Sequence, residues 1–587
     1  MIEELHQILL GCGYRYTPAS TLPKSALLYS RDHRLGYYVK SYQTLSGEFQ
    51  IALVMEDDPH TKLPIAYLVK IPEACRGRLI PHISQEHFLC YVAEMEADWD
   101  PNNLASIYKD VDNQIKLTLN NALASAEAGE PNDTELEGEF STYWKPQETL
   151  YLLVSPNKKE RLSTLLSESE WSNGHSRKEY ITINSSKDNE ISKLSQWLKQ
   201  RGLDTKSIQQ APITSHFIPM RPSQLAGVPW PPASFRDVLT WLTNVDHNAR
   251  DRMIDALMTA KMKRNIFLLH VERQDMLAFY VEINHSILGL HRNHKQKRRK
   301  SIRALVSQLG SKQVALDFKR LNVIKADRDT LLSRNLPRPG VGNLSDKRIA
   351  LIGCGTIGGY LADLLLRSGA GCGEHFLDLY DDDDYKPHNF GRHVLTAHNF
   401  GRYKADALAD SLMSSVHMAK HVRGITTQFP ITPEVISNYN IVIDTTGRPP
   451  VSKRLASVVR SMQDKQRPVL IHAFNDGNGR ASKILVDNGS CCYGCMVTDH
   501  AEYRNGIDLR FESVDQESER NISCGSTYTP YDAAVSHITA ALAQMAVLNT
   551  LEPVTPWTYN EHMLDGSRSR KPRFQKRQLD CSICANR

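Results

Sequence analysis

The sequence predicts an α/β domain with a mostly parallel sheet at residues 331–587, preceded by two α+β domains at 1–150 and 151–330. Three observations favour this organisation. A strand, glycine turn, helix and strand follow one another between Lys347 and Asp383. The 587 residues exceed what one hydrophobic core supports. Short strand-like runs separated by turn residues dominate the first 150 residues, which is typical of an antiparallel meander.

The composition indicates a soluble, intracellular chain. Hydrophobic residues make up 41% and charged residues 23%, and the formal net charge is only +5. No apolar run reaches the ~20 residues that span a bilayer. The N-terminus carries acids rather than the basic region of a signal peptide. Eleven cysteines, an odd number with two CxxC pairs, fit a reducing compartment better than a disulfide framework. We therefore expect a cytoplasmic protein without a membrane partner.

Residues 1–150 combine an amphipathic N-terminal helix, an antiparallel meander and a second helix. The apolar residues Ile2, Leu5, Ile8 and Leu9 predict the first helix. Strands are expected at 36–39, 48–55 and 63–70, an irregular segment at 76–103, and the second helix at 104–126.

The irregular segment holds a candidate catalytic cysteine, Cys90. Pro81-His82 precedes it by eight residues, and Trp99-Asp100-Pro101 follows it by nine. This spacing resembles the ubiquitin-conjugating domain, in which a His-Pro-Asn turn precedes the catalytic cysteine and a Trp-x-Pro element follows. His82 would stand in the asparagine's place, where an imidazole N–H can still donate to an oxyanion. The alternative is that Cys90 is a small buried hydrophobic residue.

Residues 151–330 are expected to form a connecting domain. A strand is predicted at 151–155, helical patterns at 191–202 and 235–263, and a hairpin at 265–272 and 275–284. The basic run from His291 to Arg303 contains no aromatic residues that could stack on bases, so it favours a solvated surface over a nucleic-acid contact.

A glycine turn organises residues 331–587. An apolar strand from Arg348 to Ile352 leads into Gly353, Gly355 and Gly358, and a helix and a strand ending at Tyr380 follow. This Rossmann-like unit predicts nucleotide binding, because the glycines let the backbone approach phosphate and the helix N-terminus offers free N–H groups. Asp381, 23 residues after Gly358, suits the ribose of NAD as well as that of ATP.

The motifs that follow the turn resemble the ubiquitin-activating superfamily, which includes the ThiF-family enzymes of thiamine and molybdopterin synthesis. The resemblance covers Arg334 to Cys584 and implies an ATP-dependent adenylation domain. It assigns ribose binding to Asp381, phosphate contacts to Asn389, Arg392 and Lys404, and Mg2+ to Asp444. It also matches Arg334 to an arginine that reaches the partner's nucleotide in homodimeric relatives, so we expect a homodimer.

These residue types suit the reaction. A carboxylate attacking the α-phosphorus of ATP must approach another anion, and the cations of Arg392 and Lys404 would offset that repulsion. A metal on Asp444 would shield the departing pyrophosphate. A dehydrogenase needs none of these groups. Taken singly, the two cations could be a solvated face, and Asp444 could be a helix N-cap.

The remaining cysteines divide into a metal-ligand set and a nucleophile. Cys492, Cys495, Cys581 and Cys584 provide the four thiolates of a closed zinc site whose two halves lie 86 residues apart. Redox dithiols or buried cysteines are the alternative. Cys524 precedes a helix predicted at 531–548, where a thiol gains thiolate character, and the resemblance makes it the catalytic cysteine.

The order of the domains resembles the fused activating and conjugating enzymes of bacterial anti-phage CBASS operons. That resemblance implies adenylation of the C-terminus of a CD-NTase cyclase, a thioester on Cys524, transfer to Cys90 and then to an amine on a protein or small molecule. Three alternatives stay open: a sulfur-carrier-protein adenylyltransferase with a non-catalytic N-terminal docking domain, a nucleotide-dependent oxidoreductase, and an interaction scaffold. The residues leave open the final acceptor and whether transfer occurs within or between chains.

Overall fold

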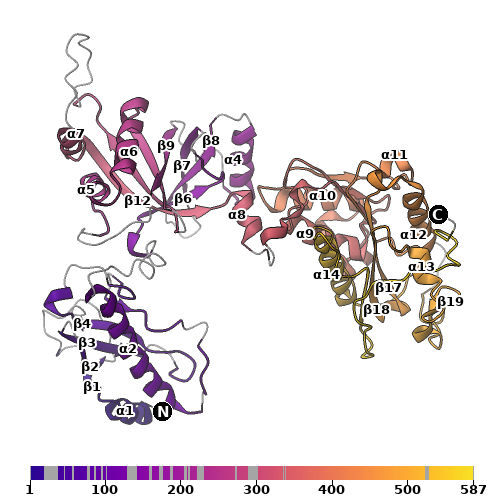
Figure 1. Ribbon diagram of the computed structural model, residues 1–587, viewed down its shortest axis with the longest axis horizontal. Helices are drawn as coiled ribbons and strands as arrows, with labels where there is room; N and C mark the ends of the chain where they lie inside the picture. The colour runs from indigo at the N-terminus through magenta and orange to yellow at the C-terminus, as the bar shows by residue number, and fades with distance from the viewer. Residues whose placement is uncertain are drawn as a thin grey trace, which may run out of the picture. The chain divides into compact units, whose positions relative to one another are not determined.

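The computed structural model contains two compact units (Figure 1). One comprises residues 1–187 and 206–324, and the other comprises residues 188–205 and 325–587. The structure describes residues 2–18, 21, 37–44, 47–55, 58–75, 80–84, 87–93, 97–100, 102–127, 142–157, 161–170, 176–185, 189–203, 208, 212–220, 230–271, 274–287, 302–334, 336, 339–521 and 528–585. None of the helices in these ranges is both long enough and apolar enough to cross a membrane.

The N-terminal part of the first unit is an antiparallel sheet with two helices on one face. The sheet order is β1-β2-β3-β4-β5. Its core joins residues of both helices, such as Leu9 and Ile107, to Ile51 and Leu68 of the sheet. The predicted helices and meander are therefore confirmed, with the bounds α1 Ile2–Gly11, β1 Arg15–Thr17, β2 Tyr37–Thr44, β3 Gly47–Val54, β4 Ile65–Lys70, β5 Phe88–Leu89 and α2 Leu104–Glu127.

The rest of the first unit is a closed barrel in the order β10-β11-β12-β6-β8-β7-β9. Apolar side chains such as Leu150, Leu166 and Ile266 form one core cluster, and three helices pack against a second cluster. The predicted hairpin is confirmed as β10 and β11. The elements are β6 Glu148–Leu152, β7 Leu162–Glu170, β8 Ser176–Asn184, β9 Ile213–Met220, α5 Phe235–Val245, α6 His247–Ala260, β10 Arg264–Val271, β11 Leu277–Ile283, α7 Ile302–Leu309 and β12 Ala315–Lys325.

The helical pattern at 235–263 is two helices rather than one. Asp246 ends α5 and accepts a hydrogen bond from the backbone N–H of Ala249, so it is also the N-cap of α6. A capping aspartate favours a non-helical backbone and so breaks the helix at this residue.

The second unit is a three-layer α/β domain with a seven-stranded sheet in the order β15-β14-β13-β16-β17-β18-β21. Its first five strands are parallel, and β18 and β21 pair antiparallel. Strand β13 begins a doubly wound arrangement, because the chain adds β14 and β15 on one side of it and β16 and β17 on the other. The predicted α/β class is confirmed. The sheet strands are β13 Ile349–Ile352, β14 Leu377–Tyr380, β15 Val422–Ile425, β16 Ile441–Asp444, β17 Val469–Asp476, β18 Ala481–Asp487 and β21 Tyr559–Met563, and the short pair is β19 Tyr503–Arg504 and β20 Ile507–Asp508.

Helices cover both faces of this sheet (Figure 1). Ile349 and Leu351 of β13 face the cluster that contains residues of α9, α10 and α14, and Ala350 and Ile352 face the cluster that contains residues of α11, α12 and α13. Alternating side chains of one strand therefore enter two cores, as expected for a buried parallel strand. The helices are α4 Asn189–Gln200, α8 Arg328–Ser333, α9 Thr356–Arg367, α10 Lys404–Ser415, α11 Pro433–Ile436, α12 Pro449–Ser461, α13 Tyr493–Val497 and α14 Ala533–Asn549.

A helix from the middle of the chain packs on this unit. The side-chain amides of Gln196 and Gln200 in α4 both donate to the backbone oxygen of Met413, at 3.0 and 3.2 Å. The Trp197 ring lies edge-on to His417 with 4.8 Å between ring centroids. The sequence predicted the helix, and only the folded chain shows what it packs against.

Candidate functional site

The glycine turn after β13 is built by close backbone packing. Gly353 has a φ of +91°, which favours glycine, and its N–H donates to the Tyr380 oxygen at 2.8 Å. A Cβ at Gly358 would lie 1.9 Å from the Gly353 oxygen, so this position of α9 excludes a side chain. A Cβ at Gly355 would meet nothing within 4 Å. Gly353 and Gly358 therefore shape the turn, and Gly355 leaves open space next to it.

A cavity of about 370 Å³ lies beside this turn at the carboxyl ends of β13, β14 and β16. That size suits a nucleotide-sized ligand. Four of the predicted site residues line it: the turn glycines Gly353 and Gly355, together with Asp381 and Lys404. The other lining residues are not among the predicted site residues: Ile352, Tyr380, Asp382, Asp383, Gln428, Phe429, Ile431, Thr445, Thr446, Arg448 and Val451. The aspartate run after β14 was a signal for Asp382 and Asp383, whereas Gln428 and Phe429 carried none.

Asp381 holds the turn from the next strand. Its carboxylate accepts the backbone N–H of Cys354 at 2.6 Å and that of Asp383 at 2.9 Å. Burial raises the pKa of Asp381 despite these hydrogen bonds. The predicted ribose-binding residue therefore lines the cavity while its carboxylate is bonded to the glycine turn.

Lys404, the first residue of α10, supplies a buried cation to the cavity. It is 7% exposed, and its ammonium group contacts the carboxylate of Asp383. Burial alone would raise the pKa of Asp383, but the hydrogen bond and charge of Lys404 outweigh it and lower that pKa. A phosphate group that displaced the Asp383 carboxylate could take its place beside the Lys404 ammonium group.

Asp444 ends β16 and lies beneath the cavity wall. It is 2% exposed, and its carboxylate accepts hydrogen bonds from Thr446, Ser452 and His472. Burial would raise its pKa, but these donors, led by His472, lower it, so the group is ionised. Thr445 and Thr446 line the cavity, whereas Asp444 does not.

The other predicted nucleotide contacts lie outside the cavity lining. Asn389 accepts the backbone N–H of Lys386 at 2.9 Å. Arg392 donates to the Thr529 oxygen at 2.7 Å, and its guanidinium lies 4.3 Å from the centroid of the Tyr531 ring. Arg334 is exposed at the end of α8. The structure thus places Arg392 against the segment that follows Cys524, which itself lies outside the described residues, as does most of the basic run at 291–303.

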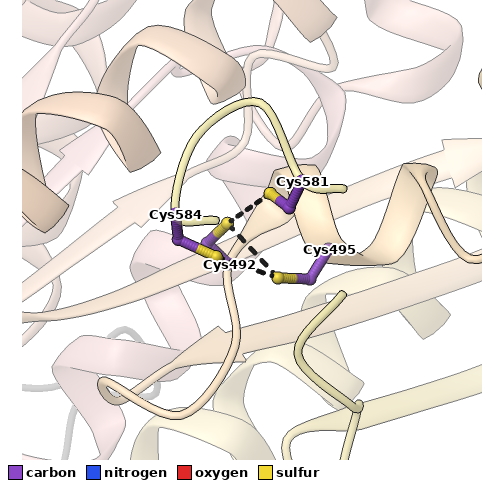
Figure 2. A group of neighbouring side chains, drawn as sticks. All are labelled: Cys492, Cys495, Cys581 and Cys584. Carbon is purple, nitrogen blue, oxygen red and sulfur yellow. Dashed lines mark hydrogen bonds between the residues drawn. The ribbon is translucent and has the colours of Figure 1, made fainter. Parts of the chain in front are cut away.

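Four cysteines meet in the C-terminal part of the domain (Figure 2). The sulfur of Cys492 lies 3.7 Å from that of Cys495 and 3.6 Å from that of Cys581, and the sulfurs of Cys495 and Cys584 are 3.2 Å apart. All four are buried. Zn–S bonds of about 2.3 Å place tetrahedral sulfurs about 3.8 Å apart, so this set could hold zinc. Cys491 is buried nearby but outside the set.

A buried arginine lies beside the cysteine cluster. Arg460 of α12 donates to the Asp487 carboxylate and to the backbone oxygens of Gly489 and Cys491. Its positive charge interacts with Cys492 and Cys584. A cation at this position offsets part of the negative charge that four thiolates bring to a zinc ion.

Cys90 is exposed directly after β5 in the N-terminal domain. Its backbone N–H donates to the oxygen of His82 at 2.8 Å, so the Pro81-His82 turn and the cysteine are adjacent. His82 has a φ of +65°, which asparagine and histidine adopt more readily than most residues. Trp99 donates to the His60 oxygen at 2.8 Å. The alternative of a buried Cys90 is wrong, because the side chain is accessible.

Comparisons with known proteins agree with this two-part layout. The model of the prokaryotic E2 family B matches residues 12–153, and that of the ThiF family matches residues 327–583. An ATP-dependent ubiquitin transferase-like protein Cap2 of Vibrio cholerae serotype O1 is 59% identical over 100% of both chains. The Cap2 of Escherichia coli strain TW11681 is 52% identical over 99% of this chain and 98% of its own.

Two more distant similarities each cover less than half of this chain. An adenylyltransferase and sulfurtransferase MOCS3-2 of Zea mays is 27% identical over 30% of this chain and 36% of its own. The crystal structure of E. coli MccB with ATP gives a TM-score of 0.31 at 19% identity, and covers 41% of this chain and 68% of that chain.

Proposed function

The chain belongs to the family of ATP-dependent ubiquitin transferase-like proteins, and on this premise we propose that it carries one protein through adenylation, thioester capture and ligation. It is an ATP-dependent activating and conjugating enzyme. The observation that carries the proposal is the pairing in one chain of a glycine-turn cavity containing a buried lysine with a separate, exposed cysteine on a conjugating-like domain.

In the first step, a carboxylate oxygen at the C-terminus of the substrate attacks the α-phosphorus of ATP, and pyrophosphate leaves. Gly353 and Gly355 give the phosphates access to the backbone, and Gly358 keeps the turn tight. Asp381 binds the ribose. Lys404 and Arg392 offset the charge of the two reacting anions, and Asn389 orients the phosphates. Arg334 reaches the nucleotide of a second subunit, as the resemblance in the sequence implies.

Magnesium would shield the charge of the pyrophosphate group. Asp444, to which the resemblance assigns the metal, is ionised because its hydrogen-bond donors lower its pKa, but it does not line the cavity and protein donors occupy both of its oxygens. The arrangement in the structure therefore leaves neither oxygen of Asp444 open to a metal.

In the later steps the acyl group moves between thiols. The Cys524 thiolate attacks the acyl-adenylate and releases AMP. The Cys90 thiolate then attacks the Cys524 thioester, and an amine finally attacks the Cys90 thioester to give an amide. The exposure of Cys90 supports its role, and the adjacent His82 can donate to the oxyanion that forms in the two steps at Cys90.

Zinc in the four-cysteine cluster would join the C-terminal tail to α13. Cys581 and Cys584 lie in the last residues of the chain, and Cys492 and Cys495 flank the start of α13. The sulfur distances support a structural, four-coordinate site rather than a catalytic one, because no ligand position is left for water.

The substrate that we propose is the C-terminus of a CD-NTase cyclase, with a protein or small-molecule amine as acceptor, in anti-phage signalling in the cytoplasm. A homodimer is also proposed. Support comes from four exposed apolar side chains within one short segment, at Phe390, Val394, Phe400 and Tyr403. Apolar groups of this kind are common at subunit interfaces.

Intact-mass spectrometry tests the order of the steps. The enzyme is incubated with ATP and a purified CD-NTase, as the wild type and as Cys90→Ala, Cys524→Ala and Cys12→Ala variants, the last being a control in the same domain as Cys90. We expect Cys90→Ala to accumulate a thioester on Cys524 without conjugate, and Cys524→Ala to form neither. If Cys90→Ala still forms conjugate, Cys90 is not needed for transfer and the N-terminal domain only docks substrate. That result would favour the alternative of a sulfur-carrier-protein adenylyltransferase, the class of enzyme to which the similar MOCS3-2 protein belongs by name.

A further inference from the structure

A second cavity lies at a gap in the wall of the barrel, within the first unit. Strand β7 pairs with residues 213–215 of β9, whereas β9 continues beside β10 as far as Met220. In the part of the chain that the structure describes, residues 216–220 of β9 therefore have no strand on the β7 side. A barrel cavity of about 640 Å³ lies along this part of β9, and its size suits a small organic ligand.

The wall of the barrel cavity combines apolar side chains with positive charge. Phe217, Ile218 and Met262 belong to its apolar part. Arg161 and Arg252 also line it, and none of the lining residues that the structure describes is Asp or Glu. The wall therefore suits a ligand that joins an anionic group to an apolar one.

Arg252 of α6 is fixed to the open part of β9. Its guanidinium donates to the Pro219 backbone oxygen at 2.6 Å. The Asp246 carboxylate lies 4.0 Å from the same guanidinium, at the limit of an ion pair, and it already accepts the Ala249 N–H as the N-cap of α6. A guanidinium has five N–H donors, and the bond to Pro219 uses one of them. Arg252 thus has a fixed position and further donors for an anion.

Arg161 reaches the same cavity from the other strand. It lies directly before β7, and its backbone oxygen accepts the N–H and the hydroxyl of Ser185, at 2.8 and 2.9 Å. These bonds fix the backbone of Arg161, while the residue itself is exposed. The cavity therefore has a guanidinium from each of two elements, the segment before β7 and α6.

The histidine in the wall adds no charge near neutral pH. The Asn265 amide nitrogen donates to the Met262 oxygen at 2.7 Å, so its Oδ1 is the atom that accepts the Nε2–H of His216, at 3.0 Å. Burial lowers the pKa of His216 and keeps the ring neutral. The positive charge of the wall therefore comes from the two arginines, which stay charged at every physiological pH.

We propose that the barrel cavity binds a small organic anion. Its phosphate or carboxylate group is bound by Arg161 and Arg252, because a guanidinium fork matches either oxyanion. Its apolar or aromatic part covers Phe217 and the neighbouring apolar side chains. This site belongs to the first unit and is separate from the nucleotide cavity of the second, so the proposal goes beyond adenylation and transfer and does not depend on them.

The test uses fluorine NMR on the full chain with three probes that share one ring. Para-fluorophenyl phosphate and para-fluorobenzoate carry the two oxyanions, and para-fluorobenzyl alcohol carries no charge. Inorganic phosphate, which has charge without a ring, is added as a competitor. Arg252→Gln and Arg161→Gln each remove one guanidinium. Arg236→Gln is the matched control, because Arg236 also donates to a backbone oxygen of this unit, that of Gly310, and does not line the cavity.

We expect at least one anionic probe to bind with a Kd in the millimolar range or lower, which is typical of a ligand of this size. The uncharged alcohol should bind about tenfold more weakly or worse, and inorganic phosphate should compete poorly. Arg252→Gln should weaken anion binding about tenfold or more, because it removes a charged donor. Arg161→Gln should weaken it about threefold, since Arg161 is exposed to solvent. Arg236→Gln should bind as wild type does, and the better of the two anions identifies the class of oxyanion.

The nucleotide cavity is the competing location for these probes. A Lys404→Met variant removes the cation of that cavity and should bind the anionic probes as wild type does. Loss of binding in Lys404→Met together with full binding in Arg252→Gln would place the probes beside the glycine turn and overturn the proposal. Equal binding of the alcohol and the anions would overturn it too, as would no binding of either anion. If Arg252→Gln does not fold, as judged by its thermal unfolding, unchanged affinity in Arg161→Gln decides against the site.

Discussion

Replacing Gly358 and Gly355 separately by alanine distinguishes the fold of the glycine turn from its function. At Gly358 the new Cβ would lie 1.9 Å from the Gly353 oxygen and 2.8 Å from the Thr445 Oγ1. The distance from this Cβ to the Gly353 oxygen is about 1.5 Å shorter than an ordinary van der Waals contact. Because that oxygen belongs to the backbone, the turn itself must move. Overpacking of this kind costs up to about 3 kcal/mol, of which the better helix propensity of alanine returns about 1 kcal/mol. We expect a net destabilisation of about 2 kcal/mol.

At Gly355 the same substitution acts on the ligand instead. The added Cβ meets no protein atom within 4 Å, but Gly355 lines the cavity beside the turn, where we propose that ATP binds. Gly355→Ala should therefore change the stability by no more than about 1 kcal/mol, which is the typical range for an N-cap change, and it should weaken ATP binding by tenfold or more.

The assay is thermal and urea unfolding together with ATP titration calorimetry on both variants. Gly340→Ala is the control, because its Cβ also enters open space and Gly340 does not line the cavity. Wild-type stability in Gly358→Ala would refute the close packing of the turn on α9. Wild-type ATP affinity in Gly355→Ala would refute the claim that phosphate approaches the turn backbone at this residue.

Three further perturbations test the rest of the domain. Lys404→Met should lower ATP–pyrophosphate exchange about 100-fold with little effect on folding, because it removes a cation from the reacting phosphates; equal exchange in the variant would contradict that role. Cys581→Ser should remove one zinc per chain in metal analysis and lower the melting temperature of the domain, and zinc retained at full occupancy would show that the cluster is not the ligand set. Glu561 contacts Arg510 and Arg570. Burial alone would raise the pKa of Glu561, but the hydrogen bond from Arg510 outweighs it and lowers that pKa to about 2. Its contribution to stability should therefore be complete above its unfolded pKa of about 4.3 and be lost as the pH falls toward 2. Urea unfolding of Glu561→Gln should show a weaker pH dependence than wild type over this window, and identical slopes would argue against the ion cluster.

Local patterns predicted most of the second unit correctly. The strand before Gly353, the helix after it and the apolar strand that ends at Asp444 are each defined by a few neighbouring residues. The spacing of the two CxxC pairs also predicted a set of four thiols, and the structure brings their sulfurs within 4.8 Å. Hydrophobic periodicity predicted one helix at 235–263, and that prediction was wrong because Asp246 ends α5 and caps α6.

The sequence by itself determined the chemistry available to this protein: a glycine turn, a group of cations and carboxylates, four cysteines with the spacing of metal ligands, and a cysteine beside a His-Pro-Asn-like turn. Only the tertiary structure decided how these groups are used. Sequence spacing says nothing of which strands lie side by side, so the contact between Asp444 on β16 and His472 on β17 had no local signal. Burial and hydrogen-bond saturation arise from the packing of distant segments, and they enclose the Asp444 carboxylate between Thr446, Ser452 and His472, outside the cavity lining.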